Sequence, residues 1–251
     1  VSSFMSIGSF YYSDKIVLSI SGARPATKKE FFNFYTVTEN LSTVANVPMP
    51  KLYVIDDTAM NAFATGRDPD HAVVCATTGL LSRLTRSELE GVIAHELSHV
   101  KNYDIRLMGM VTVLVGTVTL LADWLLRFNF GSRRKSDEDS GNLGTLLFFA
   151  GIVMALLSPI IAQLIQLAVS RRREYFADAS AVALTKHPEG LINALEKITN
   201  DKEPLEAANK ATAHLFIANP LKNRHDSIGW FAGLFNTHPP VKERIKTLRG
   251  L

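Results

Sequence analysis

The sequence predicts an α+β fold that is mostly helical, with a small β-sheet and an inserted transmembrane helical hairpin. Three observations predict this fold class. Short extended segments gather in the first third of the chain, helical spacing of apolar residues dominates elsewhere, and two long apolar runs divide the helical part. The mean hydropathy of +0.10 agrees with these runs, because a protein that folds in water alone usually has a negative value.

The composition excludes a nucleic-acid-binding surface. The net charge is only +3, and the basic residues form no dense stripe. The chain has one cysteine, Cys75, which therefore cannot form an internal disulfide. Because Cys75 lies in the apolar run 72–76, we expect a buried thiol.

The predicted strands lie in the first part of the chain. Residues 1–12 are a mixture of apolar and small residues and are expected to be the end of a segment that begins upstream. Short apolar runs bounded by turn-forming residues then predict strands at residues 15–20, 52–55, 62–64 and 72–77. Between the first two of these, apolar residues recur at helical spacing over residues 27–45 and predict a helix.

A capping box predicts where the next helix begins. In residues 85–88 a threonine stands three positions before a glutamate, so each side chain can bond the backbone amide of the other. Apolar residues at helical spacing follow, and we expect this helix to extend at least to Val100.

Two apolar runs in the middle of the chain predict the transmembrane hairpin. Residues 107–126 contain a single charged side chain, that of Asp123, and residues 143–169 contain none. A helix that crosses about 30 Å of hydrocarbon needs about 20 apolar residues, so both runs are long enough. The polar residues 127–142 would form the loop between them. The alternative is a pair of core helices, which a chain of 251 residues could hardly surround.

Helical patterns return after the hairpin. They predict helices at residues 174–185, 188–198, 204–216 and 240–249, and proline stands near the start of the last three. We therefore expect one domain formed by residues 13–106 and 171–251, into which residues 107–170 are inserted.

Residues 95–99 read His-Glu-Leu-Ser-His and predict a metal site. Residues four apart share one face of a helix, so the imidazoles of His95 and His99 can reach one ion. Glu96 lies one step around the helix, where its carboxylate can act as general base toward a water that the metal activates. Catalytic zinc is typically held by three protein ligands, so a third ligand is needed.

Several residues are candidates for this third ligand. They include carboxylates and the remaining histidines, which are His71, His187, His214, His225 and His238. Glu174 and Asp178 are favoured, because they lie four apart on one face of a predicted helix. Glu174 could bind zinc while Asp178 accepts a hydrogen bond from the free ring nitrogen of His95 or His99. The alternative is a solvated helix face beside the basic residues 171–173.

The predicted hairpin favours Glu174. Two crossings separate it from His99, so the chain returns to the side of the membrane that it left and delivers Glu174 beside the histidine helix. Lys and Arg residues near the ends of the runs are slightly more numerous on this side, which favours a cytoplasmic site.

Four motifs resemble those of the HtpX-like membrane zinc metallopeptidases, which are relatives of the CAAX prenyl proteases. They are HELSHVKNYD at residues 95–104, REYFAD at 173–178, NAFATG at 61–66 and THPP at 237–240, and the match runs over nearly the whole chain. The resemblance implies a zincin-like catalytic domain with one zinc ion per chain. The implied zinc ligands are His95, His99 and Glu174, and the implied base is Glu96.

The resemblance also implies a cellular setting. It implies a multi-pass protein of the bacterial inner membrane whose active site faces the cytoplasm and whose substrates are misfolded or damaged membrane proteins. The expected partners are therefore polypeptides and the lipid bilayer, in a role of stress-related quality control. Members of this family carry two more transmembrane helices ahead of the soluble part, and residues 1–12 are expected to be the end of the second.

Other residues acquire expected roles only through the resemblance. Asn61, Ala62 and Phe63 correspond to an edge strand that holds the substrate backbone by β-augmentation. His238 and Arg244 match a histidine and an arginine near the family's site, where a donor can stabilise the oxyanion of the tetrahedral intermediate. From the residues alone, His238 is a turn residue and Arg244 a solvated helix charge.

Two alternative functions remain open. A CAAX-prenyl-protease-like peptidase would need a large intramembrane chamber, for which two visible spans are too few. A non-catalytic zinc-bearing membrane adaptor would have no use for Glu96 beside the metal. Its structural zinc would also tend to be closed by four protein ligands.

Overall fold

The computed structural model describes residues 13–112, 170–201, 203, 205, 212, 215–217 and 239–251. Within these residues, helices surround a single four-stranded sheet, so the expectation of a mostly helical α+β protein with a small sheet is confirmed. The predicted hairpin at residues 107–170 falls mostly outside the described residues. In the described part of the chain, no helix is both long and apolar enough to cross a membrane.

The sheet has mixed topology. Its strand order is β1-β2-β4-β3, where β1 is Arg24–Pro25, β2 is Lys51–Ile55, β3 is Ala62–Gly66 and β4 is Ala72–Thr77. β2 and β4 are parallel, whereas the two outer pairings are antiparallel. The strands predicted around β2, β3 and β4 are confirmed. β1 contains only two residues, too few for a periodic pattern to reveal it.

Strands β3 and β4 form a hairpin whose connection requires a glycine. Gly66 ends β3 with a φ of 141°, and a Cβ there would lie 2.5 Å from the carbonyl oxygen of His71. The connection includes a short 3₁₀ helix, η1 (Pro69–His71), whose first turn is capped by the Asp68 carboxylate. This hairpin leaves β3 at one edge of the sheet.

The strand predicted at residues 15–20 is wrong, because this segment is helix α2 (Ser13–Ile20). Val17, Leu18 and Ser21 are buried while the intervening residues are exposed, which is helical spacing. A run of six residues, four of them apolar, fits a strand or a short helix equally well, so periodicity could not separate them.

Two further helices precede the metal motif. Helix α3 (Phe32–Ala45) confirms the helix predicted over residues 27–45, although it begins five residues later, after a turn at residues 28–30. Helix α4 (Thr78–Arg83) was missed because it has only six residues. Cys75 in β4 is fully buried, as expected.

Helix α5 (Arg86–Lys101) begins at the predicted capping box. The hydroxyl of Thr85 accepts the amide of Glu88 at 3.4 Å, and the Glu88 carboxylate accepts the amide of Thr85 at 2.7 Å. Lys197 also donates to this carboxylate at 2.7 Å. Burial raises the pKa of Glu88, but the bonds from Lys197 and Thr85 outweigh burial and hold it below its usual value. The start of α5 is therefore fixed by the capping box together with the ion pair between Glu88 and Lys197.

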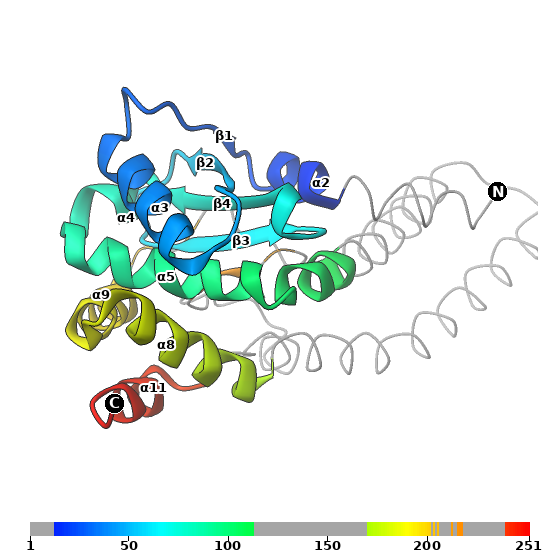
Figure 1. Cartoon of the computed structure of the whole chain (residues 1–251). Helices are drawn as coiled ribbons and strands as arrows, with labels where there is room; N and C mark the ends of the chain where they lie inside the picture. The colour runs from blue at the N-terminus through cyan, green and yellow to red at the C-terminus, as the bar shows by residue number, and fades with distance from the viewer. Residues whose placement is uncertain are drawn as a thin grey trace, which may run out of the picture.

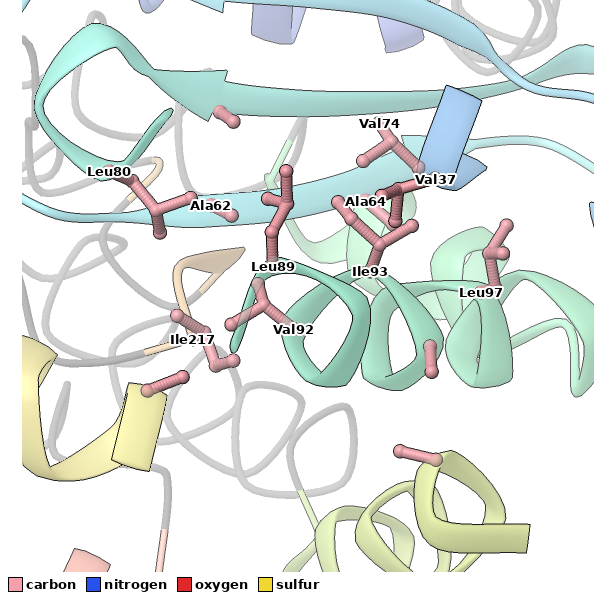
Figure 2. Close-up of a cluster of buried hydrophobic side chains, with 14 of the residues drawn as sticks. Val37, Ala62, Ala64, Val74, Leu80, Leu89, Val92, Ile93, Leu97 and Ile217 are labelled. Atoms are coloured by element: carbon pink, nitrogen blue, oxygen red, sulfur yellow. The ribbon is translucent and has the colours of Figure 1, made fainter. Parts of the chain in front are cut away.

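Helix α5 lies at the centre of the molecule (Figure 1). Leu89, Ile93 and Leu97 recur every four residues and point toward the strands (Figure 2). The opposite side of α5 is covered by α8 (Arg171–Thr185) and α9 (Pro188–Asn200), against which α11 (Val241–Leu248) packs. These helices confirm three of the four predicted after the hairpin, and the fourth, at 204–216, lies mostly outside the described residues.

The contact between α5 and α9 depends on a close approach of the two backbones. A Cβ on Gly91 would lie 2.6 Å from the amide nitrogen and 2.7 Å from the Cα of Leu191. Both partner atoms belong to helix backbone, which cannot yield as a flexible side chain does. Gly91 thus sets the distance at which α9 supports the helix that carries the histidines.

Replacing Gly91 with alanine is predicted to lower the free energy of unfolding by about 1–3 kcal/mol, because the added methyl group forces the two helices apart. The measurement is the melting temperature followed by intrinsic fluorescence. Gly250→Ala is the matched control, since a Cβ there would lie 3.4 Å from the carbonyl oxygen of Thr247, an ordinary contact distance. Equal melting temperatures for the two variants would contradict the close-packing account.

Candidate metal centre

Two histidines of α5 present one nitrogen each to the same point. His95 and His99 are 1% and 4% exposed, and their ring planes meet at 89° with centroids 4.8 Å apart. Their Nε2 atoms are separated by 3.3 Å. The four-residue spacing in the sequence therefore brings both imidazoles to one site, as the helical geometry predicts.

Glu174 of α8 closes a triangle with these two nitrogens. Its carboxylate oxygens lie 3.7 Å from Nε2 of His95 and 3.5 Å from Nε2 of His99, and the residue is fully buried. Around a tetrahedral zinc ion with ligands at about 2.1 Å, neighbouring ligand atoms are about 3.4 Å apart. The two nitrogens, 3.3 Å apart, fit two such positions. A different oxygen of Glu174 lies beside each nitrogen, Oε2 at 3.7 Å from His95 and Oε1 at 3.5 Å from His99, and one ligand atom from each of the three residues lies within 4.8 Å of the others, so the three side chains can hold one ion.

The chemistry of these groups also fits a cation. Each histidine has its Nδ1 beside a carboxylate, at 3.0 Å in both cases, so the proton of a neutral ring belongs on Nδ1. Both Nε2 lone pairs then face each other and a carboxylate. Burial lowers the pKa of His99, but Asp104, Glu174 and Glu96 outweigh burial and raise it above its usual value. The same negative potential that favours a proton here favours a metal ion.

Asp178 contacts the ring nitrogen of His95 that does not face Glu174 and His99. Its Oδ1 lies 3.0 Å from Nδ1 of His95. From the sequence alone, either histidine could be the partner of Asp178, and in the structure the partner is His95. Arg244 of α11 binds the same carboxylate with two nitrogens, Nε at 2.8 Å and one terminal nitrogen at 2.6 Å. Burial raises the pKa of Asp178, but this fork outweighs burial and lowers it to about 2. Asp178 is therefore ionised and can fix the His95 ring in one orientation.

Arg244 lies behind the metal ligands. It is fully buried, one terminal nitrogen is 3.4 Å from Nδ1 of His95, and the other is 3.7 Å from Glu174. That second nitrogen also donates to the carbonyl of Ile217 at 3.5 Å. Its observed contacts thus neutralise Asp178 and Glu174, and the oxyanion role suggested by the family resemblance stays a prediction.

Asp104 is a site residue that the sequence did not reveal. Its Oδ2 lies 3.0 Å from Nδ1 of His99, and its Oδ1 lies 3.7 Å from a terminal nitrogen of Arg173. Asp104 follows His99 by five residues, across a turn in which Tyr103 has a φ of 60°. Helical spacing applies only within one helix, so no spacing rule joins these two residues. The only signal was the acidic residue that ends the motif HELSHVKNYD.

Glu96 is 3% exposed on α5, and its charge acts on both His99 and Arg244. This places the expected base beside the metal site. Two of the other candidates for the third ligand do not reach the metal site. His71 and His187 are exposed, and they pair with Asp68 and Glu189, respectively. The remaining alternatives, His214, His225 and His238, lie outside the described residues.

The predicted substrate strand is the edge strand β3. The Asn61 carbonyl accepts the Thr77 amide at 3.0 Å, so the alternation of an antiparallel pair turns the backbone groups of Ala62 and Ala64 outward. At Ala62 both outward groups are already engaged: its amide donates to the Asn61 side chain at 3.1 Å and its carbonyl accepts the Ile217 amide at 3.0 Å.

The segment around Ile217 also covers Phe63. The rings of Phe63 and Phe216 meet edge to face with centroids 5.1 Å apart. Leu215, Phe216 and Ile217 are all buried. The chain's own residues 215–217 therefore occupy the edge of β3 at the position where the family resemblance places the substrate.

Comparison with known proteins places these features in a family. A family model described as "Peptidase family M48" matches residues 29–251. A Protease HtpX homolog of Dictyoglomus thermophilum is 49% identical over 246 residues, covering 98% of this chain and 78% of the relative. That of Syntrophobacter fumaroxidans is 47% identical over 252 residues, covering 98% and 86%. The crystal structure of S. mikatae Ste24p aligns at 19% identity with a TM-score of 0.49, covering 98% of this chain and 55% of that one.

Removing a ligand is predicted to abolish metal binding. After dialysis against zinc and then metal-free buffer, the wild type should retain about one ion per chain, whereas His99→Ala and Glu174→Gln should retain almost none. Elemental analysis by mass spectrometry measures this content. His71→Ala and His187→Ala are matched controls, since both rings are exposed and away from the site. Full metal content in the Glu174 variant would remove it from the ligand set.

Proposed function

The chain belongs to peptidase family M48, and from this premise we propose that it is a zinc-dependent endopeptidase of a membrane. Membership of this family makes the protein a metalloprotease that acts on polypeptides. Zinc as the metal, an internal peptide bond as the target and a zincin-like arrangement are the finer parts of the proposal.

One observation carries the proposal: two imidazole nitrogens and a carboxylate converge within 4.8 Å of one another, beside a second carboxylate that is not among the three. The three groups are those of His95, His99 and Glu174, and the second carboxylate is that of Glu96. A structural zinc site is usually closed by four protein ligands, whereas a catalytic site leaves one position open. Among the residues that the structure describes, three such ligands meet beside a further carboxylate, and this arrangement favours catalysis over a structural role.

The chain's own groups have distinct roles in the proposed hydrolysis. A zinc ion bound here supplies Lewis-acid chemistry, polarising the scissile carbonyl and lowering the pKa of water. Glu96 accepts the proton of the attacking water and passes it to the leaving amine. Asp178 and Arg244 keep His95 in the tautomer whose Nε2 lone pair faces the site. Burial of these groups excludes competing water and strengthens their electrostatic effects.

We place the substrate along the edge of β3 that no other strand of the described sheet pairs with. An extended peptide that adds to an edge strand is held by backbone hydrogen bonds, whatever its sequence. In this structure Ala62 is occupied by Asn61 and Ile217, so Ala64 provides the next outward-facing groups. Pairing at Ala62, or contact with the side chain of Phe63, would require residues 215–217 to move away from the edge. Recognition through backbone groups suits an enzyme that degrades unfolded polypeptides of many sequences.

The proposed setting is a bacterial inner membrane. Residues 107–170 would form a transmembrane hairpin inserted between residues 13–106 and 171–251, with the site at the cytoplasmic face. The length and apolar character of the two runs and the basic residues near their ends support this placement. Misfolded or damaged membrane proteins would then be the nearest substrates.

Glu96→Gln is predicted to retain zinc and lose cleavage, because an amide cannot accept the proton of the attacking water. The expected fall in kcat is at least about 100-fold. The assay is hydrolysis of an unfolded model protein in detergent by the zinc-loaded chain, with metal content measured on the same samples. Glu90→Gln is the matched control, since Glu90 lies on the same helix and is partly exposed in a pair with Arg86. Unchanged cleavage by the Glu96 variant would show that another group is the base.

Backbone methylation of a peptide substrate is predicted to reveal strand pairing. If the peptide adds to β3, its amides alternate between pairing and pointing away, so N-methyl groups should lower kcat/KM at every second residue. Each lost hydrogen bond should cost about tenfold. A series of singly methylated peptides measures the pattern. Losses at consecutive positions, or at none, would place the substrate elsewhere.

A further inference from the structure

The two acids that contact the metal-site histidines occupy equivalent positions in the site. Asp178 contacts Nδ1 of His95 and is held by Arg244. On the other side of the site, Asp104 contacts Nδ1 of His99 and lies beside Arg173. Each histidine is thus backed by a carboxylate that is itself paired with an arginine.

The contacts of Asp104 rank His99 above Arg173 as its main partner. The carboxylate is 3.0 Å from the imidazole nitrogen but 3.7 Å from the guanidinium. The side chain of Asp104 is 9% exposed, whereas that of Arg173 is 32% exposed. A surface ion pair would have the opposite character, with an exposed carboxylate and no close third group. Asp104 is therefore part of the metal site and not of a surface ion pair.

We propose that Asp104 is a positioning residue of the metal centre, which fixes the ring and tautomer of His99, and that Arg173 acts through Asp104. This inference rests on the metal site of the proposed function. A hydrogen bond from Nδ1–H to Asp104 leaves the lone pair on Nε2, facing Glu174. Without Asp104 the ring is free to rotate or to carry its proton on Nε2, where it cannot bind metal.

Asp104 and Arg173 also connect two parts of the chain that are far apart in the sequence. Asp104 is the first of the helical residues 104–112, which include the start of the first apolar run. Arg173 lies in the first turn of α8, just after the second apolar run. The chain that leaves toward residues 113–169 and the chain that returns from them therefore meet at Asp104. The orientation of His99 is tied to the relative position of these two chain ends.

The test measures metal affinity rather than activity. Zinc Kd is determined by competition with a chromophoric chelator for the wild type, Asp104→Asn, Asp104→Ala and Arg173→Gln, with Asp70→Asn as the control. Asp70 is exposed in helix η1, and no contact with His95 or His99 is recorded for it among the described residues. Loss of such a supporting carboxylate should raise Kd about 10- to 100-fold. Asn has the shape of Asp, so this variant remains informative if Asp104→Ala fails to fold.

A purely structural role is separated by two further readouts. The visible spectrum of the cobalt-substituted protein should change in the Asp104 variants, because it reports ligand geometry, and the melting temperature of the metal-free protein should change little. The double variant Asp104→Asn/Arg173→Gln should have the Kd of Asp104→Asn alone if Arg173 acts through Asp104.

Wild-type Kd and spectrum in Asp104→Asn would overturn the inference while leaving the metal site intact. Additive losses in the double variant would overturn the role of Arg173. Failure of the wild type itself to bind zinc would instead overturn the proposed function, together with this inference.

Discussion

The structure depends on the burial of several negative charges around one point. Glu96, Asp104, Glu174 and Asp178 are each at most 7% exposed, and burying an ionised carboxylate is costly unless it is paired. Arg244 and Arg173 offset part of this charge from the outer side. A divalent ion between His95, His99 and Glu174 would offset the negative charge that faces the metal site. The metal would then complete the packing of α5 against α8, as well as supply the chemistry.

This constraint fits the burial of residues 91–100, which cover all sides of this part of helix α5. Leu89, Ile93 and Leu97 lie against the sheet (Figure 2). The two histidines contact Glu174 and Asp178 of α8, so both the sheet and α8 are needed to hold the ligands in place. The close contact at Gly91 brings α9 near enough to support α5 without a side chain between them. Catalytic geometry is thus held by helices and a sheet, which position side chains more accurately than loops do.

Sequence reasoning succeeded where one local rule determined the structure. The capping box located the start of α5, and four-residue spacing joined His95 to His99 and Glu174 to Asp178. It did not find Asp104, because this contact crosses a turn, nor the segment at Ile217 that lies on the edge of β3. It also assigned a strand to α2, because a run of six residues is too short to show a decisive period. Contacts between separate elements depend on tertiary packing, which one sequence does not encode locally.

The central claim is that one ion is held by two imidazole nitrogens and one carboxylate oxygen, with a fourth position left for water or substrate. X-ray absorption at the zinc edge of the purified, zinc-loaded protein tests this claim most directly. The account predicts four nitrogen or oxygen neighbours at about 2.0–2.1 Å, two of them with the outer-shell scattering of imidazole rings, and no sulfur. Sulfur at about 2.3 Å, or scattering from only one imidazole, would contradict it.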